Sequence, residues 1–141
     1  MTNLNQTASV PRRFAAMIID GVILSIPIYI LLFLAPNQIA LIYAFYFIAY
    51  IFYNGYFESS ESQATIGKKL MKIKVVDTNG ERISMSKGII RAVGKIISSL
   101  IFGIGFLMAL FTNNKQSLHD KIASTFVVNS SEKANLNTDL Q

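Results

Sequence analysis

The sequence predicts an all-α integral membrane protein with two full transmembrane helices, a third membrane-embedded helical region and a small cytoplasmic β-hairpin. Hydrophobic residues make up 52% of the 141 residues and charged residues only 15%, against about 25% charged in an average soluble domain. The apolar runs 14–34 and 39–57 contain a single charged residue, Asp20. Each run is close to the ~20 residues that a helix needs to cross a bilayer. So short a chain cannot cover two such helices on all sides, which indicates a membrane protein.

The distribution of positive charge predicts the orientation of the two spans. Arg12 and Arg13 precede the first run, whereas the connection 35–38 carries no charge. Six cationic residues follow the second run: Lys68, Lys69, Lys72, Lys74, Arg82 and Lys87. Positive residues collect on the cytoplasmic side, so we expect a multi-pass plasma-membrane protein with a cytoplasmic N-terminus. The net charge of +5 then reflects topology, and we expect no nucleic-acid partner.

The chain divides into three parts around these runs. We expect residues 1–10 to be a flexible N-terminus and residues 11–128 to form a single membrane domain. We expect residues 129–141 to be a disordered tail. The first run is too long for a secretory signal and no small-residue cleavage site follows it, so we expect it to be retained.

Two later segments show the alternation of a β-strand. "KIKVVD" (72–77) alternates lysine with apolar residues, "DTNG" is typical of a turn, and "ERISM" alternates again. This pattern predicts a hairpin over residues 70–85. "STFVV" (124–128) has the same character and is a natural partner for "KIKVV".

The third hydrophobic region, 88–111, allows two arrangements. Polar side chains recur along its first part at steps of three or four residues: Lys87, Arg91, Lys95 and Ser98. Such a stripe is typical of a helix at the membrane interface with snorkelling cations. The segment 101–111 then reaches only ~16 Å, about half a bilayer, and pivots at Gly103–Gly105 as a re-entrant element. Alternatively, the region is one tilted span and residues 113–141 lie outside. The strand-like segment 124–128 favours the first arrangement, with a cytoplasmic tail.

One arginine and two aspartates occupy characteristic places in the chain. Arg13 precedes the first span, Asp20 lies within it, and Asp120 belongs to "SLHDKIASTFVV". With the connecting "TIGKKLMKIKVVDTNG", these residues resemble the RDD family of small membrane proteins over residues 11–128. The resemblance implies a multi-pass membrane protein, and the sharpest activity that it implies is cation/proton exchange.

Asp20 is the main candidate for an ion or proton site. An acidic residue costs about 2.5–3.5 kcal/mol at mid-span and usually faces the interior of a helix bundle. A carboxylate balanced between burial and nearby cations can exchange a proton for Na⁺, K⁺ or Li⁺. Depth along the second span places Tyr50 level with Asp20, so we expect Tyr50 or Asn54 to contact it. The alternative is a helix–helix hydrogen bond, or neutralisation of Arg13 or Arg91.

The other charged residues have structural or gating roles in this interpretation. Arg13 shares a helix face with Asp20 but lies about 10 Å from it, so Asp120 becomes its partner if the tail is cytoplasmic. A simple cytoplasmic anchor is an equal alternative for Arg13. We expect His119 and Asp120 to form a cap or turn anchor. The loop lysines are expected to attract anionic lipid headgroups: Lys68, Lys69, Lys72 and Lys74.

No pattern predicts catalysis, a metal site or a cofactor. The chain has no cysteine and a single histidine, and we expect it not to be an enzyme. We expect a cation/proton antiporter or transport component in the lipid bilayer, assembled as a homo-oligomer because two or three helices alone make a poor conduit. The alternative is a non-catalytic membrane scaffold or assembly factor that recruits a partner through the basic cytoplasmic loop.

Overall fold

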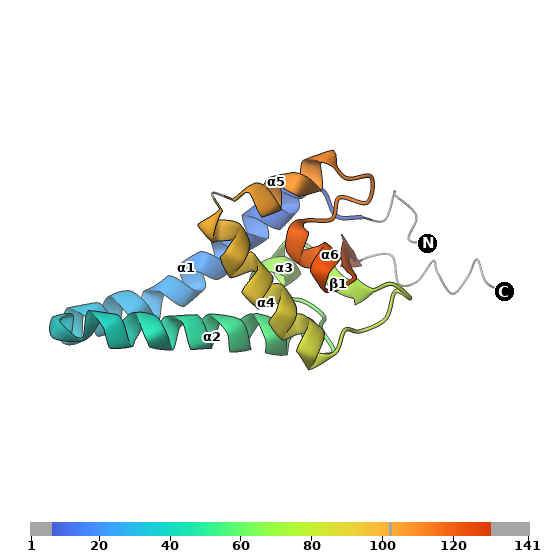
Figure 1. The fold of residues 1–141 in the computed structure, drawn as a ribbon. Helices are drawn as coiled ribbons and strands as arrows, with labels where there is room; N and C mark the ends of the chain where they lie inside the picture. The colour runs from blue at the N-terminus through green and yellow to red at the C-terminus, as the bar shows by residue number, and fades with distance from the viewer. Residues whose placement is uncertain (1–6, 102, 131–141) are drawn as a thin grey trace.

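The fold is a long helical hairpin with the rest of the chain gathered at its open end (Figure 1). The structure is a computed structural model and describes residues 7–101 and 103–130. In chain order the elements are α1 (Val10–Leu34), η2 (Pro36–Gln38), α2 (Ile39–Ser59), α3 (Ile66–Leu70), β1 (Ile73–Asp77), α4 (Met85–Leu100), α5 (Ile104–Phe111), α6 (Leu118–Ile122) and β2 (Thr125–Asn129). The flexible ends expected at residues 1–6 and 131–141 lie outside the described residues.

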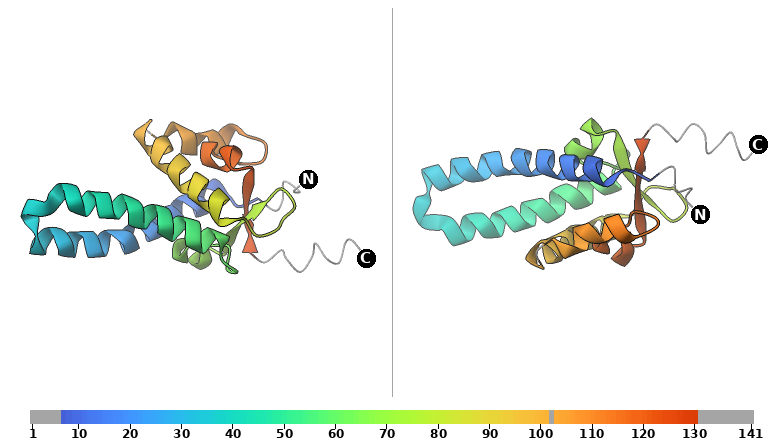
Figure 2. Two further views of the ribbon diagram at one scale, coloured as in Figure 1. Left: turned by 60° about the horizontal axis from the view of Figure 1, so that its bottom comes forward. Right: turned by 90° about the horizontal axis from the view of Figure 1, so that it is seen from above.

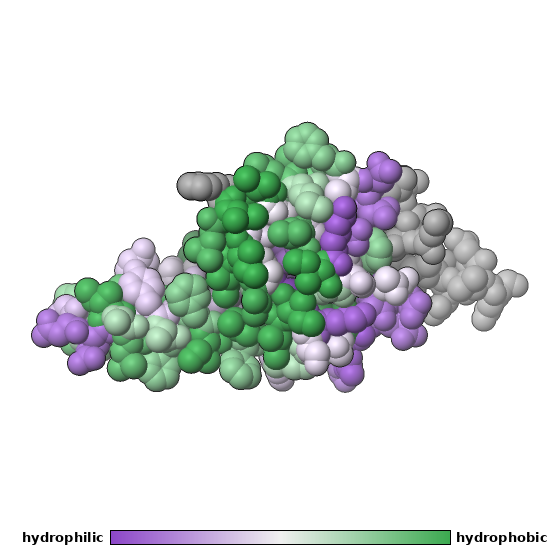
Figure 3. All heavy atoms as spheres, viewed as in Figure 1, coloured by the Kyte–Doolittle hydropathy of each residue, from purple (hydrophilic) through white to green (hydrophobic). Residues whose placement is uncertain are grey.

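The two long helices are the two predicted spans. α1 has 25 residues, which gives a length of about 37 Å, and both α1 and the segment Pro36–Ser59 are long and apolar enough to cross a membrane. Their apolar side chains face outward, including Phe33 at 86% exposed. Hydrophobic side chains form a belt between hydrophilic ends (Figure 3). This is the surface of a protein that is solvated by lipid.

Glycine allows α4 to pack closely against the end of α2. A Cβ atom on Gly88 would lie 2.8 Å from the carbonyl oxygen of Gly55, so the two backbones approach within a distance that a larger side chain would prevent. Small residues permit this kind of contact between membrane helices. The contact fixes α4 beside the last turns of α2.

The small sheet joins segments that are far apart in the sequence. β1 pairs with β2 in antiparallel register, from Ile73 opposite Asn129 to Asp77 opposite Thr125. The pairing of "KIKVV" with "STFVV" is therefore confirmed. The hairpin expected over residues 70–85 is wrong in its second strand. Residues 81–84 form no strand and lead directly into α4, whose N-cap is Ser84.

The N-terminal segment is tied to this sheet. Thr7 forms a bridge with Val128, and the Ala8 N–H donates to the Val127 carbonyl oxygen at 2.8 Å. Both residues are buried, so the expectation of a flexible segment over 1–10 is wrong for residues 7–10. Six residues form a small apolar core beneath the sheet: Ala8, Ala16, Ile73, Val75, Ile83 and Val127.

α4 and α5 form a sharply bent pair of helices. The chain turns by 102° between the two helices, and Gly103 has a φ of 74°, which favours glycine. β1 precedes this pair and β2 follows it, yet the two strands are paired. Paired strands must lie on the same side of a membrane, so this pairing favours the re-entrant arrangement of the third region over a tilted span.

The cationic stripe of α4 faces protein and not the headgroups. Arg91 and Ser98 are fully buried and Lys95 is 7% exposed, whereas Ile90 and Ile97 are 44% and 47% exposed. The expectation of snorkelling cations is therefore wrong for Arg91 and Lys95. The reason is that α2 and α6 supply carboxylates to these two cations.

Single cysteines test this topology, since the chain has none of its own. We expect Asn79→Cys and Asn113→Cys to react with a membrane-impermeant maleimide from one side of the membrane, and Asn37→Cys from the other. All three positions are exposed. Labelling is compared between intact and permeabilised cells. If Asn113→Cys is labelled from the same side as Asn37→Cys, the third hydrophobic region must cross the membrane, and the predicted topology is wrong.

Candidate functional site

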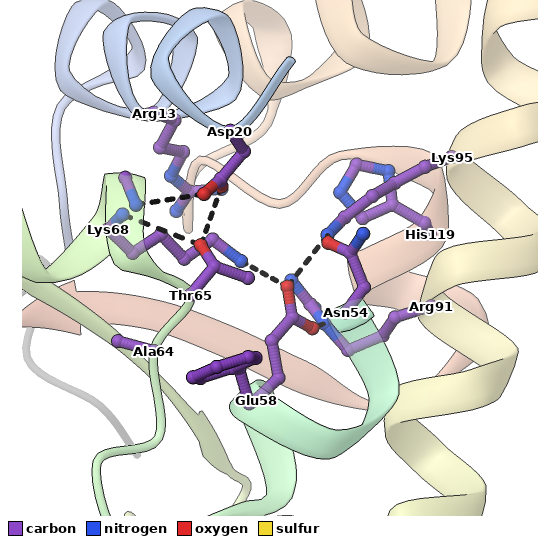
Figure 4. A network of polar contacts seen from close by, with 12 residues as sticks. Arg13, Asp20, Asn54, Glu58, Ala64, Thr65, Lys68, Arg91, Lys95 and His119 are labelled. Atoms are coloured by element: carbon purple, nitrogen blue, oxygen red, sulfur yellow. Dashed lines mark hydrogen bonds and ion pairs between the residues drawn. The ribbon is translucent and has the colours of Figure 1, made fainter. Parts of the chain in front are cut away.

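A network of buried charged and polar side chains lies at the open end of the hairpin. It joins residues of α1, α2 and α4 to the segment around α3 (Figure 4), and Arg91 extends it to α6. Many of these side chains line a cavity of about 440 Å³. The network contains two clusters of ion pairs, around Glu58 and around Asp120, and a separate hydrogen-bonded carboxylate, Asp20.

Asp20 accepts three hydrogen bonds and is 8% exposed. Tyr53 Oη and the Gly67 N–H donate to its Oδ1 at 2.8 Å each, and Thr65 Oγ1 donates to its Oδ2 at 2.6 Å. An ionised carboxylate only accepts hydrogen bonds, so the three donors match it. Asp20 thereby fastens the segment that begins α3 against α1.

The predicted partners of Asp20 are corrected by this geometry. Among the described residues its hydrogen bonds come from Tyr53, Thr65 and Gly67, and not from Tyr50 or Asn54. The Asn54 side chain instead accepts from Lys95 Nζ at 2.8 Å and donates to the Tyr50 carbonyl oxygen at 2.9 Å. Matching depths along two helices selected Tyr50 although Tyr53, three residues later on α2, is the donor. It missed Thr65 and Gly67 because the chain folds back after α2 and brings residues 65–67 to α1.

Glu58 is the centre of the first ion-pair cluster. Its carboxylate is fully buried and pairs with Lys68, with Lys95 Nζ at 2.7 Å and with Arg91 Nε at 2.7 Å. Glu58 is not among the site residues predicted from the sequence, although a carboxylate in the last turn of an apolar span is a usable signal. Its position one turn beyond Asn54 explains why Lys95 reaches both.

Asp120 is the centre of the second cluster. It pairs with Arg91 and with Arg13 NH1 at 2.9 Å, which is the contact expected for Arg13 if the tail returns to the side of the N-terminus. Asp120 also accepts from the Ser117 N–H at 3.1 Å within a capping box that starts α6. Burial opposes ionisation, but Arg91 and Arg13 help to hold the pKa of Asp120 well below its usual range.

The loop lysines are not the single exposed cluster that was expected. Lys68 and Lys74 are buried, at 8% and 7% exposed, whereas Lys69 and Lys72 are exposed. Lys68 folds inward because Glu58 is its partner. The predicted attraction of lipid headgroups therefore stays a prediction for Lys69 and Lys72.

Burial lowers the pKa of two groups that lie outside the spanning helices, Lys68 and His119. Burial lowers the pKa of Lys68 to about 7, with Glu58 opposing the shift and Lys95 and Arg91 adding to it. Burial also lowers the pKa of His119 to about 3, so this imidazole is neutral at pH 7. Within residues 7–101 and 103–130, no group of three or more His, Cys, Asp or Glu side chains is placed to hold a metal ion.

Gly67→Ala tests the contact between α3 and α1. A Cβ atom there would collide with the Ala16 carbonyl oxygen and lie 2.9 Å from the Asp20 carboxylate, so α3 must move and its hydrogen bond to Asp20 weakens. We expect the free energy of unfolding to fall by about 1–3 kcal/mol. Gly21→Ala is the matched control, because its Cβ meets nothing within 4 Å. Denaturant unfolding in detergent measures both, and equal stabilities would contradict the packing.

Glu58→Gln tests the first cluster. The substitution leaves three buried cations around a neutral side chain, and we expect a loss of about 3–5 kcal/mol in the free energy of unfolding. The double variant Glu58→Gln/Lys68→Met removes one of the unpaired cations, so it should be more stable than Glu58→Gln alone. A double variant at least as unstable as the single variant would contradict a shared charge network.

The chain is similar to several known bacterial proteins. The chain is 37% identical over 142 residues to the Bacillus subtilis protein YxaI, covering 82% of this chain and 93% of that protein. It is 28% identical over 138 residues to YckC of the same organism, covering 89% of this chain and 86% of that protein.

A shorter match reaches a longer mycobacterial protein. The proline-rich antigen homolog of Mycobacterium tuberculosis (strain ATCC 25618 / H37Rv) is 33% identical over 82 residues, which covers 57% of this chain and 34% of that protein. No solved structure matches the chain. The model of the RDD family matches residues 7–124, from the strand-like start that bridges β2 to the end of α6. The chain is a membrane protein of the RDD family.

Proposed function

We propose that the protein exchanges a monovalent cation (Na⁺, K⁺ or Li⁺) for a proton across the plasma membrane, with the buried Glu58–Lys68 pair as the exchange site. The observation that carries the proposal is that Lys68 Nζ and Lys95 Nζ both contact Glu58 Oε1 beside the cavity. An ammonium group there occupies the position that a metal cation would take on the carboxylate. Loss of the proton from Lys68 frees that position.

The charges of the network support a one-for-one exchange. Four cations, Arg13, Lys68, Arg91 and Lys95, accompany three carboxylates, Asp20, Glu58 and Asp120. The network therefore carries one net positive charge while Lys68 is protonated, and none after Lys68 loses its proton. Binding of one monovalent cation then restores the net charge of the network to one positive charge. The buried site thus has the same charge in its proton-loaded and cation-loaded states.

Lys68 is the group of this network that changes charge near neutral pH. The pKa of about 7 makes its ammonium and amine forms similar in population at pH 7. Arg13 and Arg91 stay protonated because a guanidinium is not deprotonated in proteins, and His119 stays neutral. Glu58 from α2 and Lys95 and Arg91 from α4 are the charged groups that act on Lys68.

Asp20 is a positioning residue in this proposal and not itself the exchange site. Its bonds to Thr65 Oγ1 and to the Gly67 N–H hold the residues immediately before Lys68. Thr65 Oγ1 also accepts from the Lys68 N–H at 3.4 Å. Asp20→Asn would therefore act on exchange by moving Lys68 relative to Glu58.

The alternative of a scaffold that recruits a partner through a basic loop has less support. Two basic residues of the loop, Lys68 and Lys74, are buried, which leaves Lys69, Lys72 and Arg82 as its exposed cations. Two spanning helices do not enclose a pathway, so we infer that the exchanger is a homo-oligomer. The excess of cations at the open end of the hairpin supports a cytoplasmic N-terminus.

Cation-driven proton flux in liposomes tests the exchange. Purified protein is reconstituted with an internal pH-sensitive dye, and Na⁺, K⁺ or Li⁺ is added at pH 6, 7 and 8. The Lys68 ammonium competes with the cation, so the apparent cation affinity should fall with decreasing pH, approaching tenfold per unit well below pH 7. Above pH 7, the affinity should become nearly independent of pH.

Lys68→Gln is the decisive variant and Lys69→Gln its control. Lys68→Gln removes the exchanging proton, so cation-driven proton flux should be lost, whereas the exposed Lys69 should tolerate the change. Both variants are compared at matched incorporation after circular dichroism and size-exclusion chromatography establish folding. No flux from the folded wild type, or undiminished flux from Lys68→Gln, would overturn the proposal.

A further inference from the structure

We infer that the cavity beside the charged network binds the phosphate headgroup of an anionic membrane lipid that enters sideways from the bilayer. The inference does not depend on cation exchange. It follows from a cationic inner wall, an apolar mouth and the position of the cavity between two pairs of helices.

The cavity lies between the hairpin and the bent pair. One wall comes from α1 and α2, and the other from α4 and α5, with α6 closing one end. α4 and α5 lie beside the hairpin near its open end in the two further views (Figure 2). A volume of about 440 Å³ is within the range of a small-molecule site.

The inner wall has the chemistry of an anion site. Four cations line the cavity: Arg13, Lys68, Arg91 and Lys95. The two lining carboxylates are already engaged, since Asp20 accepts three hydrogen bonds and Asp120 pairs with Arg13 and Arg91. The network with protonated Lys68 has one net positive charge, which a phosphodiester would neutralise.

Donors remain available on this wall. Within residues 7–101 and 103–130, the buried Arg13 Nε has no hydrogen-bond partner. Lys95 Nζ uses two of its hydrogens, on Asn54 and Glu58, and an ammonium has three. Phosphate oxygens accept such charge-assisted bonds strongly.

The mouth of the cavity selects an amphiphile over a water-soluble anion. Four apolar residues that line it are also exposed on the lipid-facing surface: Phe14 at 58%, Met17 at 38%, Phe47 at 47% and Leu100 at 76%. Acyl chains can remain in the bilayer against these side chains while the headgroup reaches the cations. A free phosphate would gain nothing from them.

Gly21 offers a way to block the cavity without disturbing the network. It lines the cavity, and a Cβ atom there would meet nothing within 4 Å. Leucine and alanine are both better helix formers than glycine. Gly21→Leu should therefore fill part of the cavity in a folded protein, and Gly21→Ala is the matched control.

Lipid binding is measured with purified protein in detergent by thermal shift and by native mass spectrometry. Phosphatidylglycerol is titrated against phosphatidylcholine and against water-soluble glycerol phosphate. We expect wild type and Gly21→Ala to bind phosphatidylglycerol at least about tenfold more tightly than either comparison ligand, and Gly21→Leu to lose about tenfold in affinity.

Three results would overturn the inference. Equal binding of phosphatidylglycerol and phosphatidylcholine would indicate unspecific lipid contact, and equal binding of glycerol phosphate would indicate a site for free anions. Equal affinity of Gly21→Leu and Gly21→Ala would place the lipid outside this cavity. Because no ion gradient is present, these results are independent of the cation-driven proton flux and do not bear on exchange.

Discussion

The arrangement of helices at the open end of the hairpin depends on the ion pairs of the buried Arg91 guanidinium. This guanidinium pairs with Glu58 of α2 through Nε and with Asp120 of α6 through NH1, and it is fully buried. Separating a buried ion pair leaves an unpaired charge in a region of low polarity, at a cost of about 3–5 kcal/mol. α4 therefore keeps its orientation with cations inward and its apolar face toward lipid.

This constraint explains why the polar residues of the chain form one network. Arg91 connects the Glu58 cluster to the Asp120 cluster, and Asp120 connects through Arg13 to α1. Asp20 then fixes α3 to the same helix. Five helices are thereby held by charged or charge-assisted contacts at one end, while the far end of the hairpin needs only apolar surface.

The two transmembrane helices and the pairing of β1 with β2 could be predicted from the sequence. Long apolar runs are a direct requirement of bilayer thickness, and period-2 alternation identified β1 and β2 as partners. The sequence was not sufficient for the contacts of Asp20, because Thr65 and Gly67 approach only through a backbone turn that no periodicity records.

Charged residues near the membrane were harder to interpret from the sequence than apolar ones. The polar stripe that contains Arg91 and Lys95 has the same spacing whether it faces lipid headgroups or protein. It faces protein because the Glu58 carboxylate pairs with both cations. Lys68 was ambiguous for the same reason. Arg13 and Asp120 were paired correctly because their pairing depended on topology, which the strand pattern supplied.

The pairing of β1 with β2 also has a consequence for biosynthesis. β2 and Asp120 are made last, whereas Arg13, Glu58 and β1 leave the ribosome early. At about 5–20 residues per second, Arg13 waits several seconds for Asp120, which follows 107 residues later. During that interval water at the membrane boundary must solvate Arg13, whereas Glu58 meets its partner Lys68 only ten residues later. The Arg13–Asp120 pair and the β1–β2 sheet are therefore the last of these contacts that the growing chain can form.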